Sequence, residues 1–279
     1  MGTCEYCGKS AGLFRSFHPS CKETYDTGYN RMVQLVAAVA HHGSEDDSSR
    51  LPERLDLIAK NSAVPKERIR EALVSGWTTA LDLFLDDKSL APDEEERLMA
   101  FASRFSLTPE ELNVSGAYGR AAMGATIWEL LDGKIPCRLK FKGLPFNLQG
   151  DEALVWAFGQ SKYYEEKVRR EFVGAHHGVS LRVARGVYYR VGGFKGHPVE
   201  RSELVEVDTG IVGVTSKRLY FAGPRKSLRV PYSKVVSFRP YSDGLGIYRD
   251  SASAKQQIFI TGEGWFIYNL VSNLAARPD

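Results

Sequence analysis

The sequence lacks the features that would identify a membrane protein or a nucleotide-dependent enzyme. No stretch approaches the ~20 consecutive apolar residues that a membrane-crossing helix needs, and the N-terminus has charge and a cysteine pair where an export signal would be apolar. The glycines of residues 192–196 lack the Gly-Lys-Ser/Thr of a phosphate-binding loop, so we expect a hairpin turn there and an exposed turn at His176–His177. We therefore expect a cytoplasmic protein without a transmembrane segment.

The composition is that of an ordinary globular protein, but its charge is unevenly distributed. The 279 residues are enough for two domains, and 43% are hydrophobic and 25% charged. Residues 1–150 carry 18 basic and 21 acidic residues, whereas residues 151–279 carry 19 and 13. The net charge of +3 therefore combines −3 in the first half with +6 in the second.

Three of the four cysteines and one histidine form a metal-binding pattern near the N-terminus. Cys4 and Cys7 have the spacing with which a tight turn presents two thiolates to one tetrahedral ion, and His18 and Cys21 supply a second pair. The pattern predicts a structural Zn²⁺ site, because four protein ligands leave no open position for water. The alternatives are a redox Cys-x-x-Cys motif or unrelated reduced thiols. Cys137 has no partner pattern.

The residues around these ligands favour a compact zinc finger. Gly8 follows the first cysteine pair and permits the backbone conformation of a metal-binding knuckle. We expect a small hairpin in residues 13–17, and Pro19 marks the start of a helix from which His18 and Cys21 project. The arrangement resembles treble-clef and short zinc-ribbon fingers, which implies a small finger domain in residues 1–24.

Apolar residues at steps of three and four predict an all-α helical block in residues 25–133. The expected helices span residues 22–43, 51–58, 65–85 and 92–105, and a last one runs from a capping box at Thr108 to Gly133. Residues 43–50 contain no apolar side chain, so we expect a linker or an exposed loop there. His41 and His42 are adjacent and point to different helix faces, which favours a helix C-terminal cap over a metal site.

An acidic turn interrupts this helical block. Asp86, Asp87, Asp93 and Glu94 lie on either side of a short connection between two predicted helices. Residues 83–94 and 105–110 resemble the tellurite-resistance TerB-like helical family, and the resemblance implies that these four carboxylates are candidate metal ligands. Lys88 stands where that family usually has glycine, and the alternating oxygen ligands of an EF-hand are absent. The alternative is that these acids cap helix N-termini.

Alternating apolar residues predict an antiparallel sheet in residues 151–279. The clearest strands lie in residues 211–214, 219–221, 228–230, 235–238 and 257–261. Phe266, Leu270 and Leu274 share one face of a helix predicted in residues 263–276 and would close one open end of a bent sheet. Residues 134–150, which contain two prolines and two glycines, form the expected linker between the helical block and the sheet.

Residues 214–221 read as a strand, a polar turn and an aromatic strand, and they are followed by Arg229-Val230-Pro231-Tyr232. This order resembles the GRAM and bacterial pleckstrin-homology-like families. The resemblance implies a pleckstrin-homology-like domain in residues 151–279, and loops at one open end of such folds can hold anionic lipid head groups. The candidate residues for that role are Lys217, Arg218, Arg225, Lys226 and Arg229. Each basic residue near an anionic bilayer contributes on the order of 1 kcal/mol. The alternative is a solvated strand face.

These patterns together predict an α+β multidomain protein with a small zinc finger, an all-α helical block and a C-terminal antiparallel sheet closed by a helix. The function they favour is a non-enzymatic cytoplasmic adaptor or scaffold that binds a protein or an anionic membrane. The alternative is a nucleic-acid-associated zinc-finger protein using Lys9, Arg15 and Lys22, but the acidic balance of the first half argues against phosphate binding. Catalysis is not expected, because four protein ligands leave a metal no position for activating water.

Overall fold

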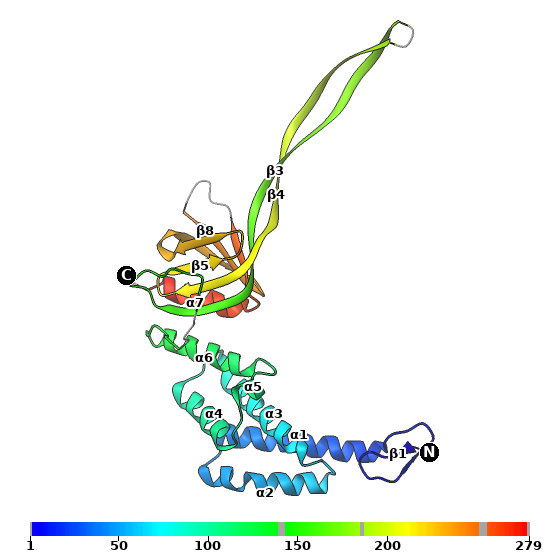
Figure 1. The fold of residues 1–279 in the computed structure, drawn as a ribbon, viewed down its shortest axis with the longest axis vertical. Coiled ribbons are helices and arrows are strands. Elements are labelled where there is room, and N and C mark those ends of the chain that lie inside the picture. Colours follow the sequence, from blue (N-terminus) through cyan, green and yellow to red (C-terminus); the bar gives the residue numbers. More distant parts are fainter. Residues whose placement is uncertain (1, 139–142, 185–186, 251–255, 278–279) are drawn as a thin grey trace. The chain divides into compact units, whose positions relative to one another are not determined.

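The chain forms two compact units, Met1–Pro136 and Cys137–Asp279 (Figure 1). The computed structural model describes residues 2–138, 143–184, 187–250 and 256–277, with the backbone alone for residues 168–202. The division between the units falls within the linker predicted for residues 134–150. Among the described residues, no helix combines the length and the apolar character needed to cross a bilayer.

The first unit joins a two-stranded sheet to a group of packed helices. Strands β1 (Gly2–Thr3) and β2 (Ser10–Gly12) are antiparallel. The helices that follow are α1 (Pro19–His42), α2 (Glu45–Asn61), α3 (Glu67–Phe84), the 3₁₀ helix η1 (Leu85–Asp87), α4 (Pro92–Arg104), α5 (Pro109–Leu112) and α6 (Ala117–Leu131). The boundary predicted between residues 24 and 25 lies inside α1, so one continuous helix connects the finger to the helical core.

Helices α1 and α3 form the centre of this core. Met32 and Val36 of α1 and Trp77 and Leu81 of α3 are all 0% exposed and belong to one apolar cluster. The indole Nε1 of Trp77 donates a hydrogen bond of 2.9 Å to the carbonyl of Leu98 in α4, which satisfies the only polar group of this buried ring. The apolar periodicity therefore identifies the buried faces of both helices correctly.

Residues 43–50 begin a helix, so the expectation of a linker or an exposed loop was wrong. Ser44 is the N-cap of α2, and its hydroxyl accepts a hydrogen bond of 3.2 Å from the Asp47 N–H. The Asp47 carboxylate in turn accepts one of 3.0 Å from the Ser44 N–H. This reciprocal capping box starts the helix before its first apolar residue, Leu51, so the hydrophobic pattern does not reveal the first turns.

The segment predicted as one helix after Thr108 contains two helices. The capping box at Thr108 is confirmed, because the Glu111 N–H donates to the Thr108 hydroxyl and the Thr108 N–H donates to the Glu111 carboxylate. Helix α5 nevertheless ends at Leu112. Gly116 has a φ of 72°, a left-handed conformation that cannot continue a right-handed helix, and α6 starts at the next residue.

The second unit is one antiparallel sheet with a C-terminal helix. Its strands are β3 (Leu154–Ala184), β4 (Val187–Thr215), β5 (Arg218–Ala222), β6 (Ser227–Pro231), β7 (Val235–Pro240), β8 (Gly244–Arg249) and β9 (Gln257–Ile260). Their order across the sheet is β6-β5-β4-β3-β9-β8-β7. The first and last strands of the unit therefore pair with each other, and the consecutive strands β6 and β7 lie at opposite edges.

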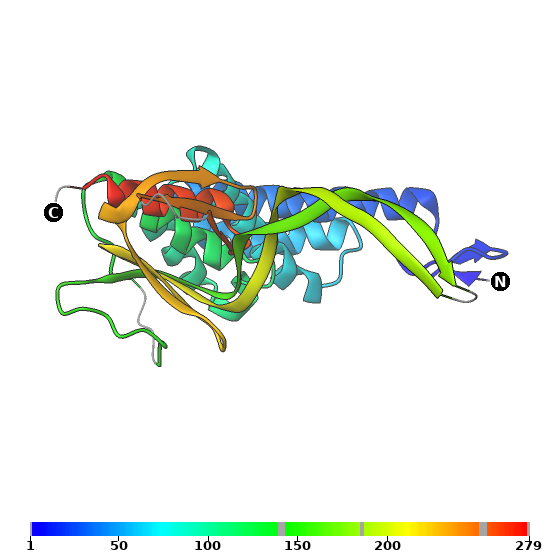
Figure 2. The ribbon, with the colours of Figure 1, turned by 90° about the horizontal axis from the view of Figure 1, so that it is seen from above.

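Helix α7 (Gly264–Ala275) packs against this sheet (Figures 1 and 2). The helix predicted for residues 263–276 is thus confirmed, and Phe266, Leu270 and Leu274 are buried as expected. The Phe266 ring lies 4.8 Å from that of Trp156 and 5.9 Å from that of Phe158, measured between centroids. These edge-to-face contacts join the helix to strand β3.

Strands β3 and β4 continue beyond the sheet as a twisted two-stranded ribbon (Figures 1 and 2). Strand β3 pairs with β9 only over residues 162–165, whereas β3 and β4 pair with each other from Leu154 and Thr215 to Ala184 and Val187. The turns expected at residues 176–178 and 192–196 are wrong, because these segments pair with each other within the ribbon. The glycines of these two segments weaken a strand but do not prevent the backbone pairing of β3 with β4.

Candidate metal centre

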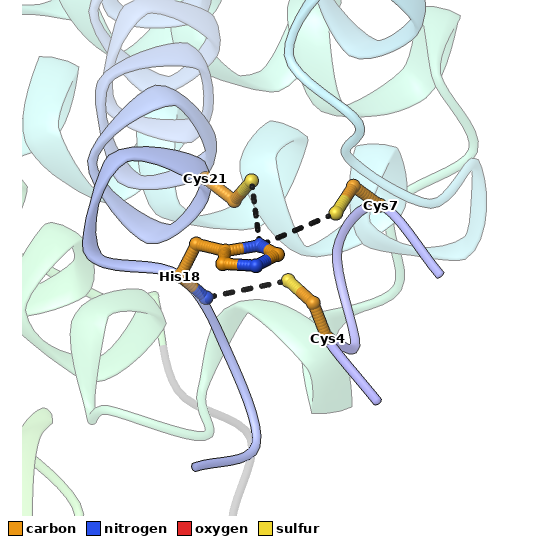
Figure 3. A group of neighbouring side chains, drawn as sticks. All are labelled: Cys4, Cys7, His18 and Cys21. Carbon is orange, nitrogen blue, oxygen red and sulfur yellow. Dashed lines mark hydrogen bonds between the residues drawn. The ribbon is translucent and has the colours of Figure 1, made fainter. Parts of the chain in front are cut away.

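Four side chains from residues 4–21 lie together at the start of α1 (Figure 3). The ligand atoms of Cys4, Cys7, His18 and Cys21 all lie within 4.8 Å of one another. Cys4 follows β1, Cys7 lies in the turn before β2, His18 is the N-cap of α1 and Cys21 lies in its first turn. Within the described residues, this is the one group of three or more cysteine, histidine or carboxylate side chains close enough to share a metal ion.

The turn between β1 and β2 holds the first two cysteines. The Cys4 N–H donates to the Lys9 carbonyl at 2.8 Å, and the Gly8 N–H donates to the Cys4 carbonyl at 2.8 Å. Gly8 has a φ of 69°, as expected for the residue that closes such a knuckle. The hairpin therefore surrounds the first cysteine pair, whereas residues 13–17, where a hairpin was expected, form turns and bends without strands.

His18 is oriented so that one ring nitrogen faces the thiols. Its Nδ1 lies 3.4 Å from the Cys7 Sγ and 3.6 Å from the Cys21 Sγ. Its Nε2 lies 3.0 Å from the Ser10 carbonyl oxygen, to which it donates a hydrogen bond when Nδ1 is the metal ligand. A hydrogen bond from the second ring nitrogen to a backbone carbonyl is the usual way in which a metal-bound histidine is held in place.

The surroundings of Cys4 favour its thiolate form. Burial raises the pKa of this thiol, but hydrogen bonds from the backbone N–H groups of His18, Cys7 and Tyr6 outweigh that effect and bring the pKa to about 6. By contrast, burial and the neighbouring Cys7 thiol raise the pKa of Cys21. Because metals bind the thiolate, Cys4 is prepared for binding at neutral pH, whereas a positive ion would have to displace the proton of Cys21.

Aromatic contacts attach this centre to α1. The Tyr6 ring, between the two knuckle cysteines, lies 4.8 Å from the Tyr25 ring of α1 and 6.3 Å from the Phe17 ring. Cys137 is exposed and belongs to the other unit, so it takes no part in the cluster. The arrangement offers a metal ion three sulfur atoms and one nitrogen atom in a closed site.

The acidic residues of the helical block make local contacts. The Asp87 carboxylate accepts hydrogen bonds from the Ser89 N–H at 2.8 Å and from its hydroxyl at 2.9 Å. The Glu94 carboxylate accepts one of 2.9 Å from the Ala91 N–H at the start of α4, and Asp93 lies 3.6 Å from Arg97. Asp86 is exposed. The Glu94 contact matches the capping alternative, whereas Asp87 accepts its hydrogen bonds in the turn after η1. A metal role for the four carboxylates stays a prediction.

Most of the candidate basic residues of the sheet have carboxylate partners. Lys217 lies 2.5 Å from Asp151, Arg225 lies 3.4 Å from Asp208 and Lys226 lies 3.3 Å from Glu165. Arg218 forms an ion pair with Glu152, whose side chain is completely buried. Arg229, on the edge strand β6, is exposed. These partners were not predicted from the sequence, although Asp151 and Glu152 stand shortly before β3.

Neither the comparison with protein-family models nor the comparison with curated proteins finds a match for this sequence.

Proposed function

We propose that this protein is a non-enzymatic adaptor with a structural zinc site and a pleckstrin-homology-like module that binds a partner protein. The observation that carries the proposal is the closed set of three thiols and one imidazole at the start of α1. Four protein ligands complete the tetrahedral coordination of Zn²⁺ and leave no position for a substrate or an activated water. The role that fits such a site is to hold the N-terminal turn against the helix.

Zinc is the ion that best suits this donor set. Soft thiolates and imidazole in a set of four favour Zn²⁺ over Mg²⁺ or Ca²⁺, which take oxygen ligands. The hydrogen bond between His18 and the Ser10 carbonyl supports Nδ1 as the coordinating atom. The knuckle at Gly8 and the helix start at His18 agree with the treble-clef-like finger proposed from the sequence.

The C-terminal unit supports a pleckstrin-homology-like docking module. Its described residues form seven antiparallel strands, with the polar turn of residues 215–218 between two of them and an amphipathic helix after the last strand. Lys217, Arg218, Arg225 and Lys226 each have a carboxylate partner, so their charge is largely compensated within the unit. This compensation favours a protein partner over an anionic membrane, which attracts uncompensated charge.

Metal analysis of paired variants tests the zinc assignment. Protein purified without chelator is expected to contain about one zinc per chain, and Cys137→Ser is expected to retain it. Cys21→Ser should lose the metal, and because structural zinc contributes on the order of 10 kcal/mol to local folding, hydrogen exchange should rise throughout residues 2–24. Equal zinc contents in the two variants would overturn the proposed site.

Vesicle flotation tests the choice of a protein partner. Vesicles of neutral lipid and vesicles with a high content of anionic lipid are mixed with the protein at physiological salt. We expect the protein to stay unbound in both cases. Binding to anionic vesicles that disappears in Arg225→Ala/Arg229→Ala would overturn that choice and make this unit a membrane-binding module.

A further inference from the structure

Residues 143–153 of the second unit lie against the outer face of its sheet. Gly213, Tyr220 and Arg229 form one row across β4, β5 and β6, because they are direct partners in the strand pairing. The neighbouring row, which contains Val214, Leu219 and Val230, is buried in the core. Successive residues of a strand point to opposite faces, so the row that contains Tyr220 faces away from that core.

An aromatic residue of this segment occupies a space that a glycine leaves open. The Phe146 ring lies 5.5 Å from the Tyr220 ring. A Cβ atom on Gly213 would lie 2.6 Å from Cε2 of Phe146, and its nearest neighbours would all be atoms of that ring. The absence of a side chain at Gly213 therefore creates the place in which Phe146 lies.

The acidic end of the segment meets the basic turn between β4 and β5. Asp151 pairs with Lys217 at 2.5 Å, while Glu152 pairs with Arg218 and accepts a hydrogen bond of 2.6 Å from the Tyr220 hydroxyl. The two pairs differ in burial. The side chains of Lys217 and Asp151 are 40% and 60% exposed, whereas that of Glu152 is completely buried. The contact of Glu152 is therefore part of the buried structure of the unit, whereas the contact of Asp151 lies at its surface.

The part of the segment before Glu152 is attached only by side chains. Within the described residues, the backbone of residues 144–151 forms no hydrogen bond with a strand. The first backbone hydrogen bond to the neighbouring turn runs from the Ser216 N–H, between β4 and β5, to the Ala153 carbonyl. Gly143, with a φ of 73°, begins the segment, and Gly150 lies directly before Asp151. Exposed ion pairs contribute little to stability, and segments held by few contacts open locally at low cost.

We propose that the surface formed by Gly213, Lys217 and Tyr220 is a docking site for an extended segment of a partner protein, and that residues 144–151 are its internal occupant. The partner segment carries an aromatic ring for the space beside Gly213 and, about five residues later, a carboxylate for Lys217. The inference rests on the proposed docking function of this unit and specifies the chemistry of the partner. An internal occupant competes at a high effective concentration, so it lowers the apparent affinity for the partner.

The test uses a fluorescent peptide with the sequence of residues 143–151 and three full-length proteins. In Phe146→Ala/Asp151→Ala the internal segment loses both of its surface contacts, so the site is free. In Gly213→Ala the internal segment is also displaced, but the added methyl group fills the space for the aromatic ring. Limited proteolysis within residues 144–150 is expected to become faster in both variants, because a displaced segment is more accessible to a protease.

The two variants should differ in their affinity for the peptide. We expect Phe146→Ala/Asp151→Ala to bind it at least tenfold more tightly than the unaltered protein does, and Gly213→Ala to bind it no better than the unaltered protein. A peptide in which alanine replaces phenylalanine should bind none of the three. Equal affinities for the unaltered protein and both variants, or no binding at all, would overturn this inference. Neither result would alter the zinc content or the flotation result, so the adaptor proposal would be judged separately.

Discussion

Replacing Gly76 with alanine tests the close approach of α1 and α3 at the centre of the helical core. A Cβ atom at this position would clash with Cβ and Cγ1 of Val36 and would lie 2.9 Å from the Val33 carbonyl oxygen. In an open helix the same substitution would stabilise by about 1 kcal/mol. Overpacking a core costs up to about 3 kcal/mol, and the backbone oxygen has no rotamer that avoids the clash. We therefore expect a net destabilisation of about 2 kcal/mol, from these two effects.

Hydrogen exchange resolved to the peptides of α1 and α3 measures this effect in the helical unit alone, which avoids treating a two-unit chain as two-state. A loss of about 2 kcal/mol corresponds to exchange about 30-fold faster for the slowest amides. Gly119 of α6 is the matched control, because an added Cβ would meet only the Asn113 Oδ1 at an ordinary 3.6 Å. Gly119→Ala should leave exchange in α1 and α3 unchanged. Unchanged or slower exchange in Gly76→Ala would refute the argument.

Three further substitutions test other parts of the structure. Hydrogen bonds from Arg70 and from the Thr108 backbone lower the pKa of Glu111 to about 2. The contribution of its ionised carboxylate to stability is therefore present above pH ~4.3 and is lost as the pH falls from there towards 2. In Glu111→Gln, the melting temperature should depend less on pH over that range. Asp208→Ala should speed exchange in residues 223–226, because its carboxylate accepts hydrogen bonds from the Arg225 and Lys226 N–H groups at 2.7 and 2.8 Å; unchanged exchange would exclude that role. Gly116→Ala should destabilise the connection between α5 and α6 by about 1 kcal/mol through its left-handed backbone, and an unchanged melting temperature would contradict this.

Local signals predicted the elements that depend on local interactions. The spacing of Cys4, Cys7, His18 and Cys21 identified the cluster that the fold brings together, because both pairs lie in a tight turn or in the first turn of a helix. Proline and the capping box likewise marked the starts of α1, α4 and α5. The capping box at Ser44 carries the same kind of signal as the one at Thr108, but the apolar periodicity of α2 begins only at Leu51 and does not mark its first turns.

Features that depend on distant pairing were not predictable in the same way. The pairing of β3 with β9 joins residues about 95 positions apart, and no local pattern specifies it. Beyond the residues that pair with β9 and β5, the described parts of β3 and β4 pair only with each other, so their sequence need not follow the alternation of a half-buried strand. The ion pair between Asp151 and Lys217 likewise depends on how the segment before β3 returns to the turn after β4.

X-ray absorption at the zinc edge tests the central claim, a closed site of three cysteines and one histidine, most directly. Protein purified without chelator should contain one zinc per chain, with three sulfur neighbours at about 2.3 Å and one nitrogen neighbour at about 2.0 Å. His18→Cys should change this shell to four sulfur atoms if the metal is retained. An oxygen neighbour from water, or fewer than three sulfur neighbours in the unaltered protein, would contradict the account.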